Sequence, residues 1–120
     1  MKIAFTTSGD DLGASLESRF GRAPRFLIYD LDNSTYEVID NSQTMNTAQG
    51  AGIQAAETIV HSGATALVTG HCGPKAFKVL SAAGIRVYNV AGCTVGAALE
   101  AFRSGQLKTI ESADVEGHWV

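Results

Sequence analysis

Two cysteines and a histidine lie where a predicted strand runs into a predicted helix. His71 and Cys72 occupy the turn 70–73, and Cys93 directly precedes Thr94. A thiol beside a helix N-terminus has a lowered pKa. Thiolates suit soft metals and metal–sulfur clusters, and imidazole is the commonest metal ligand. This pattern predicts Cys72, His71 and Cys93 as metal ligands. The alternative interpretation is that both cysteines are small buried hydrophobic residues.

Three arginines follow one another at intervals of three residues, as Arg19, Arg22 and Arg25 in a segment that also contains Gly21. A guanidinium group offers several N–H donors at once and binds oxyanions and other anions well. The alternative is a loop whose arginines form surface ion pairs, each worth little. We expect the arginines to bind an anion.

The sequence lacks the motifs of several other functional classes. The two cysteines do not form a CxxC pair, which argues against a zinc-finger or thiol redox motif. The segment 70–75 (GHCGPK) lacks the phosphate-loop spacing, and no GxGxxG follows a predicted strand. Neither a GxSxG elbow nor a Ser-His-Asp order is present. The sequence therefore favours a binding protein over an enzyme.

The elements that position these residues follow from hydrophobic periodicity and turn residues. Strands are predicted at 2–7, 26–31, 35–39, 64–69 and 85–90, with loops at 8–23 and 41–49. One helix runs to about His61 and is followed by Gly63. A second begins at Pro74 and ends at Gly84, and a third is capped by Thr94 and closed by Gly105.

The alternation of helix and strand after residue 50 is typical of parallel βαβ units, and the first half adds a strand and a hairpin. We therefore predict an α/β fold, with a mixed sheet of about five strands and helices on its faces. Ligands of such sheets bind outside the carboxyl ends of the strands. Segments 6–8, 70–73 and 91–94 should meet there, two of them at helix N-termini that favour anions. The candidate cofactor-binding residues are Arg19, Phe20, Gly21, Arg22, Arg25, Gly70, Gly73, Lys75 and Thr94.

Length and charge narrow the functional class. A chain of 120 residues is one domain in size. The net charge of -3 disfavours a nucleic-acid partner. No apolar run is long enough for a membrane span, and no signal peptide is evident, so we expect a cytoplasmic protein. Residues 1–108 carry no net charge and form the predicted domain; residues 109–120, with Glu111, Asp114 and Glu116, form an acidic tail.

The motif at 19–30 (RFGRA, then FLIYD) resembles the opening of the dinitrogenase iron–molybdenum cofactor biosynthesis family. The resemblance continues, in the right order, through 50–52 (GAG), Gly63, 73–77 (GPKAF), 83–88 (AGIRVY) and from Val95 to Leu107. It covers nearly all of residues 1–108. The family includes carriers of the NifX and NafY type, the C-terminal part of some NifB proteins, and the stand-alone orange protein with its molybdenum–copper sulfide cluster.

The resemblance implies a three-layer, ribonuclease-H-like fold and a non-catalytic role in holding a metal–sulfur cluster that contains molybdenum with copper or iron. Many members have His where this chain has Gln49, and Asn where it has Lys75. The first difference argues against a His-based cluster ligand. The second adds a cation that would suit an anionic cluster.

We therefore expect a small carrier that binds an anionic metal–sulfur cluster at the carboxyl edge of the sheet and passes it to a protein partner. The alternative is a binding protein or an enzyme for a phosphorylated small molecule, which would use the same anion-binding edge. A ligand-free protein-interaction module is the third possibility. Binding of sugar phosphates or nucleotides, but not of metal sulfides, would favour the second.

Overall fold

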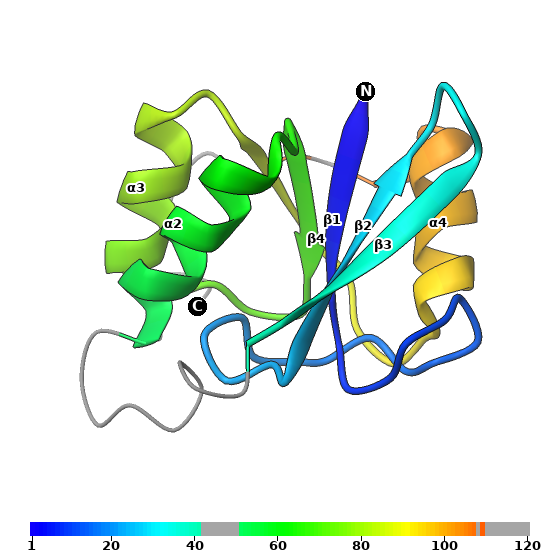
Figure 1. Ribbon diagram of the computed structural model, residues 1–120, viewed down its shortest axis with the longest axis horizontal. Coiled ribbons are helices and arrows are strands. Elements are labelled where there is room, and N and C mark those ends of the chain that lie inside the picture. The colour runs from blue at the N-terminus through cyan, green and yellow to red at the C-terminus, as the bar shows by residue number, and fades with distance from the viewer. Residues whose placement is uncertain (42–50, 108, 110–120) are drawn as a thin grey trace.

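Five strands form one mixed sheet in the order β3-β2-β1-β4-β5 (Figure 1). The computed structural model describes residues 1–41, 51–107 and 109. The strands are β1 (Lys2–Thr7), β2 (Arg25–Asp30), β3 (Thr35–Asp40), β4 (Ala66–Thr69) and β5 (Arg86–Asn89). The hairpin β2–β3 and the pair β1–β2 are antiparallel, whereas β4 runs parallel to both β1 and β5.

Three helices cover the two faces of the sheet. Helices α2 (Ala51–Ser62) and α3 (Pro74–Ala82) lie together on one face, and α4 (Val95–Arg103) lies on the other (Figure 1). The result is a three-layer α/β sandwich, which confirms the fold predicted from the sequence. In the described part of the chain, no helix has both the length and the apolar composition needed to cross a membrane.

The alternation of side chains along each strand divides the core in two. In β1, Ala4 faces α2 and α3, while Ile3 and Phe5 face α4. In β4, Leu67 belongs to the first cluster and Val68 to the second. All five side chains are fully buried. Since successive residues of a strand point to opposite faces, the same parity decides which polar residues at the strand ends face which helices.

The predicted elements are confirmed, with boundaries shifted by one or two residues. Gly63, Gly84 and Gly105 adopt φ of 85°, 80° and 74°, the left-handed conformation that ends a helix and that glycine adopts without strain. Thr94 caps α4, its hydroxyl accepting a hydrogen bond of 3.1 Å from the Ala97 amide. The loop that holds Gln49 and the acidic tail beyond Thr109 lie outside the described residues.

The long segment between β1 and β2 runs along the carboxyl edge of the sheet. Its first half packs on α4: the amides of Val95 and Gly96 donate to the carbonyls of Ala14 and Leu12 at 2.9 and 2.8 Å. The Ala98 amide donates to Thr94 O, 3.0 Å away. Together with the Thr94 cap, these bonds satisfy the amides at the start of α4. The expectation that this N-terminus is free to bind an anion is therefore wrong.

Candidate functional site

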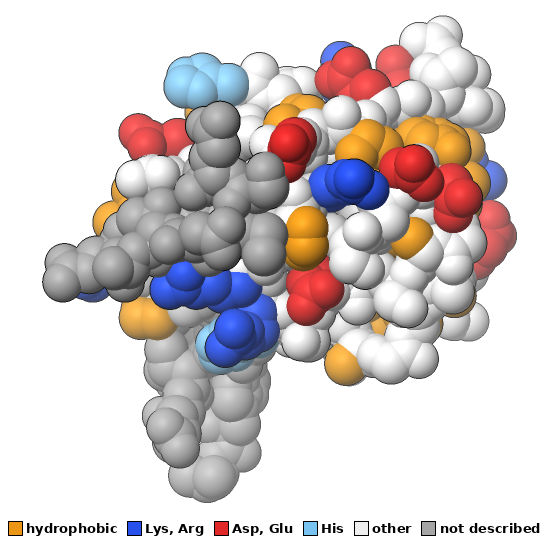
Figure 2. Space-filling view, turned by 60° about the horizontal axis from the view of Figure 1, so that its bottom comes forward, with side chains coloured by type: hydrophobic (Ala, Val, Ile, Leu, Met, Phe, Trp, Pro, Cys, Tyr) orange, Lys and Arg blue, Asp and Glu red, His pale blue; other side chains and the backbone are white. Residues whose placement is uncertain are grey.

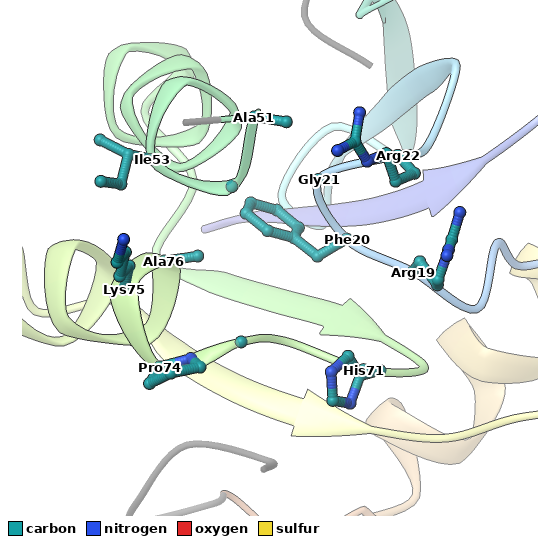
Figure 3. Close-up of a pocket in the computed structure, with 12 residues that line it drawn as sticks. Arg19, Phe20, Gly21, Arg22, Ala51, Ile53, His71, Pro74, Lys75 and Ala76 are labelled. Atoms are coloured by element: carbon teal, nitrogen blue, oxygen red, sulfur yellow. The ribbon is translucent and has the colours of Figure 1, made fainter. Parts of the chain in front are cut away.

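A pocket of about 460 Å³ opens at the carboxyl edge of the sheet, on the face covered by α2 and α3 (Figure 3). This volume is within the range of small-molecule sites, about 300–1,000 Å³. Three segments surround it: the loop before β2, the first turn of α2, and the turn between β4 and α3 together with the first residues of α3. The described residues that line it are Arg19, Phe20, Gly21, Arg22, Ala51, Gly52, Ile53, His71, Gly73, Pro74, Lys75 and Ala76.

Close backbone packing holds the loop against α2 and the β4–α3 turn. A side chain on Gly21 would place its Cβ 2.9 Å from the amide nitrogen of Gly52, too near for any residue but glycine. A Cβ on Gly70 would lie 2.7 Å from the carbonyl oxygen of Ser18. The Phe20 amide donates to the carbonyl of His71 at 3.0 Å. These contacts fix the backbone that presents the two arginines.

The floor of the pocket is apolar. The Phe20 ring is 2% exposed and stacks on Phe26 with ring centroids 5.7 Å apart. Ala51 and Ala76, from α2 and α3, are also buried. Phe20 thus anchors the loop in the core while its neighbours Arg19 and Arg22 reach the rim.

The N-terminus of α3 adds backbone donors. The N-cap residue is Gly73, which has no side chain to accept a hydrogen bond from the first amides of the helix. Pro74, the first helical residue, has no amide proton. The amides of Lys75 and Ala76 donate to no acceptor within the described residues. Such unsatisfied amides, together with the positive end of the helix dipole, form a local site for negative charge. The open space around Gly73, where a Cβ would meet no atom within 4 Å, leaves this end of α3 accessible.

The charged side chains among the described lining residues of the pocket are cations. Arg19, Arg22 and Lys75 line it, and His71 adds an imidazole (Figure 3). None of its described lining residues is Asp or Glu. Figure 2 shows Lys and Arg side chains gathered beside a His, whereas most of the Asp and Glu side chains visible in that view lie elsewhere. A chain with a net charge of -3 thus presents a local cationic surface.

Most of the residues predicted from the sequence meet at this pocket. The loop contributes Arg19, Phe20, Gly21 and Arg22. The β4–α3 turn contributes His71 and Gly73, and the first turn of α3 contributes Lys75. Gly70 does not line the pocket but packs closely against Ser18 in the loop. Arg25 is exposed at the start of β2 and is not among the lining residues. Thr94 is also absent from that set, because α4 lies on the other face of the sheet.

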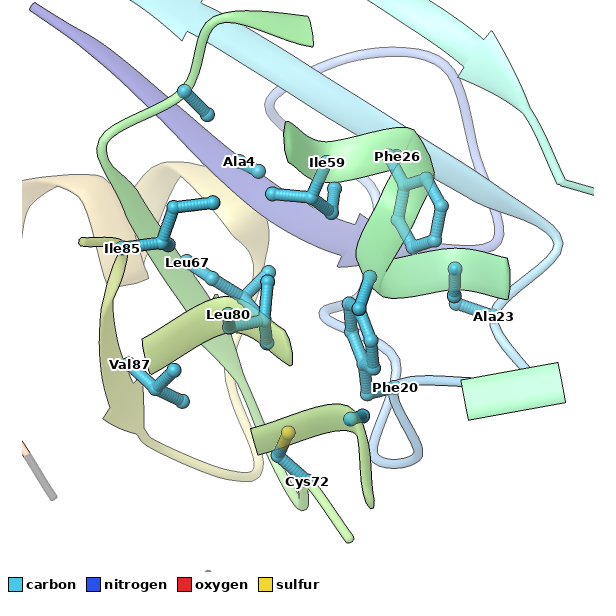
Figure 4. Close-up of a cluster of buried hydrophobic side chains, with 14 of the residues drawn as sticks. Ala4, Phe20, Ala23, Phe26, Ile59, Leu67, Cys72, Leu80, Ile85 and Val87 are labelled. Atoms are coloured by element: carbon cyan, nitrogen blue, oxygen red, sulfur yellow. The ribbon is translucent and has the colours of Figure 1, made fainter. Parts of the chain in front are cut away.

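The two thiols do not converge. Cys72 is 0% exposed and packs in the core cluster under α2 and α3, close to Phe20 and Leu80 in Figure 4. Cys93 packs against the cluster on the α4 face. Cys72 lies just before α3 with its side chain buried, so the structure favours the alternative interpretation of Cys72 as a small buried residue over a metal ligand at the edge. Among the described residues, no group of three or more His, Cys, Asp or Glu could hold a metal ion.

The sequence did not predict that the first turn of α2 forms a wall of the pocket. Its residues Ala51, Gly52 and Ile53 carry no charge or hydrogen-bonding side chain, so their types gave no chemical signal. The available signal was a pair of glycines far apart in sequence. Gly21 and Gly52 are the residues that let two backbones touch.

Similar structures share both this fold and nearly the whole chain length. The apo orange protein from Desulfovibrio gigas is 39% identical, with a TM-score of 0.92 over 95% of this chain and 96% of its own. A Thermotoga protein assigned to NifB and to the DUF35 family is 34% identical, with a TM-score of 0.84 over 97% and 98% of the two chains. Protein MJ0580 of Methanocaldococcus jannaschii is 30% identical over 114 residues, 92% of each chain.

The fold and these relatives define a class of small, three-layer α/β proteins related to iron–molybdenum cofactor proteins. Residues 1–105 match the family model described as dinitrogenase iron-molybdenum cofactor. The chain belongs to this family, as the motif from Arg19 onward predicted.

Proposed function

We propose that the protein is a non-catalytic carrier that holds an anionic metal–sulfur cluster in the pocket between the arginine loop and α3. The observation that carries the proposal is the convergence of Arg19, Arg22 and Lys75 with the unsatisfied amides at the start of α3. Guanidinium, ammonium and amide groups are all donors to negative charge. The family to which the chain belongs supports molybdenum, with copper or iron, as the metal content.

The donors that line the pocket fit a cluster held by charge and hydrogen bonds. The described lining residues include no thiol, and both cysteines pack in apolar surroundings on opposite sides of the sheet. The apolar floor around Phe20 suits the polarisable sulfide surface of such a cargo. We therefore leave Cys72 and Cys93 out of the proposed binding set and retain His71 as a lining residue.

Reconstitution tests this proposal. The purified protein is incubated without oxygen with tetrathiomolybdate and copper, or with iron and sulfide, and then desalted. We expect a visible chromophore and a stoichiometric metal content to remain with the protein. Loss of all colour and metal on desalting, under every condition, would contradict the carrier function.

A parallel calorimetric titration with nucleotides and sugar phosphates addresses the alternative ligand class, because helix N-termini and arginines also bind phosphate. Micromolar binding of one of these compounds, without binding of metal sulfides, would replace the cluster by a phosphorylated ligand. The proposal includes delivery of the cluster to a protein partner in the cytoplasm. Pull-downs with apo and metal-loaded protein test whether such a partner distinguishes the two forms.

A further inference from the structure

Two threonines at the ends of neighbouring strands form a hydroxyl pair on the face of the sheet where the pocket opens. Thr6 ends β1 and Thr69 ends β4, and both side chains are 0% exposed. Their hydroxyl oxygens lie 2.9 Å apart and share a hydrogen bond. By the alternation of side chains along a strand, Thr6 lies on the same face as Ala4, and Thr69 on the same face as Leu67. This is the face covered by α2 and α3, on which the pocket opens.

The hydroxyl pair reaches the loop two residues before Arg19. The Thr6 hydroxyl donates to the carbonyl of Glu17 at 2.8 Å, and the Glu17 amide donates back to the carbonyl of Thr6 at 2.8 Å. A hydroxyl carries one proton but also accepts, so Thr6 can serve Glu17 and Thr69 at once. Three residues further on, the Phe20 amide is bound to His71. The backbone that carries Arg19 is therefore fixed on both sides.

Packing alone does not explain this pair. Valine has nearly the shape of threonine and would fill the same space. Burying a hydroxyl costs free energy unless it is hydrogen-bonded, and valine would avoid that cost. The hydroxyls instead provide directional hydrogen bonds, which fix the position at which the loop crosses the ends of β1 and β4. We propose that Thr6 and Thr69 are positioning residues of the anion pocket, which hold the backbone at Glu17 and thereby fix the loop from which Arg19 and Arg22 line the pocket. This inference rests on the proposed anion-binding function.

Thr7 provides a matched control within the same strand. It is also 0% exposed, and its hydroxyl also binds the loop, donating to Ser15 O at 3.0 Å and accepting from the Gly9 amide at 3.1 Å. By parity its side chain lies on the α4 face, together with Phe5. Thr7 therefore anchors the half of the loop that packs on α4, away from the pocket.

The test compares Thr6→Val, Thr69→Val, Thr6→Ser and Thr7→Val in the full chain. Each variant is titrated with tetrathiomolybdate, and its midpoint of urea unfolding is measured. Amide hydrogen exchange is followed at Glu17 and Phe20. Releasing the loop lowers the fraction of molecules in the binding-competent form, which raises the apparent Kd in proportion. Thr6→Val removes both hydrogen bonds of the Thr6 hydroxyl, and the one to the Glu17 carbonyl is the bond that holds the loop. We expect about five- to tenfold weaker binding from the loss of that bond.

We expect a smaller loss of affinity for Thr69→Val, which leaves the bond from Thr6 to Glu17 in place, and wild-type affinity for Thr6→Ser. Thr7→Val should lower the unfolding midpoint about as much as Thr6→Val while leaving the affinity unchanged. Equal weakening by Thr7→Val, or unchanged affinity in Thr6→Val, would overturn the positioning role. If Thr6→Val does not fold, wild-type affinity in Thr69→Val would overturn it.

Hydrogen exchange separates this inference from the proposed function. If the wild-type protein binds no tetrathiomolybdate, the cluster proposal fails, but exchange still reports on the loop. Faster exchange at Glu17 and Phe20 in Thr6→Val, and not in Thr7→Val, would support the positioning role. Unchanged protection of these two amides in Thr6→Val would overturn it.

Discussion

Replacing Arg19 by alanine tests the role of the cationic side chains that line the pocket. Arg19 is exposed, lines the pocket, and makes no ion pair within the described residues. A hydrogen bond from a charged donor contributes about 1.5–3 kcal/mol. Because solvent screens an exposed charge, we take the lower end of this range. Since about 1.4 kcal/mol corresponds to a factor of ten in Kd, we expect binding about tenfold weaker in Arg19→Ala.

Arg25→Ala is the matched control. Arg25 has the same side chain, is also exposed, and lies at the start of β2, but it is not among the described residues that line the pocket. We expect its affinity to stay within about twofold of the wild type, because a charge outside the site acts only through the screened long-range field. Neither variant should change the unfolding midpoint measurably, since exposed loop charges contribute little to stability.

The assay is a titration of the apo protein with tetrathiomolybdate and copper, followed by absorbance at low and at moderate ionic strength. The wild-type affinity should fall as salt is added, and this salt dependence should be weaker in Arg19→Ala because one cation of the site is missing. Equal affinities in Arg19→Ala and the wild type would refute the role of the cationic rim. Equal losses of affinity in Arg19→Ala and Arg25→Ala would show that binding depends on the overall charge of the protein and not on the position of Arg19.

Three further outcomes follow from particular contacts. Gly21→Ala should destabilise the protein by about 1–3 kcal/mol in urea unfolding, because its Cβ meets the backbone of α2; Gly73→Ala, whose Cβ meets nothing within 4 Å, should not. Cys72, 0% exposed, should resist iodoacetamide in the folded state while half-buried Cys93 reacts, and rapid alkylation of Cys72 would contradict its core position. The hydrogen bond from the Asn33 side chain, with the amides of Asp32 and Asn33, lowers the pKa of Asp30. Because the folded pKa lies below the unfolded one, Asp30 should stabilise the protein above the unfolded pKa and lose this effect as pH falls through the folded pKa. Acid unfolding compared with Asp30→Asn measures it.

The elements could be predicted from the sequence because their signals are local. Glycines at 63, 84 and 105 mark helix ends, and each adopts positive φ in the structure. The face on which each helix packs is not local information. The periodicity of α4 shows that Val95 and Leu99 face a sheet, but not on which side of the sheet the helix crosses. This is why Thr94 and Cys93 were grouped with a pocket that opens on the opposite face.

The arginine loop was predicted as part of the site from residue type alone, yet its path depends on contacts that have no sequence period. The bonds from the Glu17 amide to the Thr6 carbonyl, and from the Phe20 amide to the His71 carbonyl, join residues more than ten positions apart through backbone atoms that every residue carries. The orientation of Cys72 was ambiguous for a related reason. Adjacent residues in a turn often point in opposite directions, and here His71 is exposed while Cys72 is buried.

A pocket of charges and amides, without a thiolate, has a consequence for how a carrier would release its cargo. Metal–thiolate coordination in structural sites contributes on the order of 10–16 kcal/mol, which makes exchange slow. A few charged hydrogen bonds at an open rim contribute less and weaken with ionic strength or with a competing anionic surface. An acidic partner that contacts Arg19 and Lys75 would therefore compete directly with the cluster for the same donors. In the proposed carrier, the chemistry that binds the cargo is also the chemistry through which a partner could remove it.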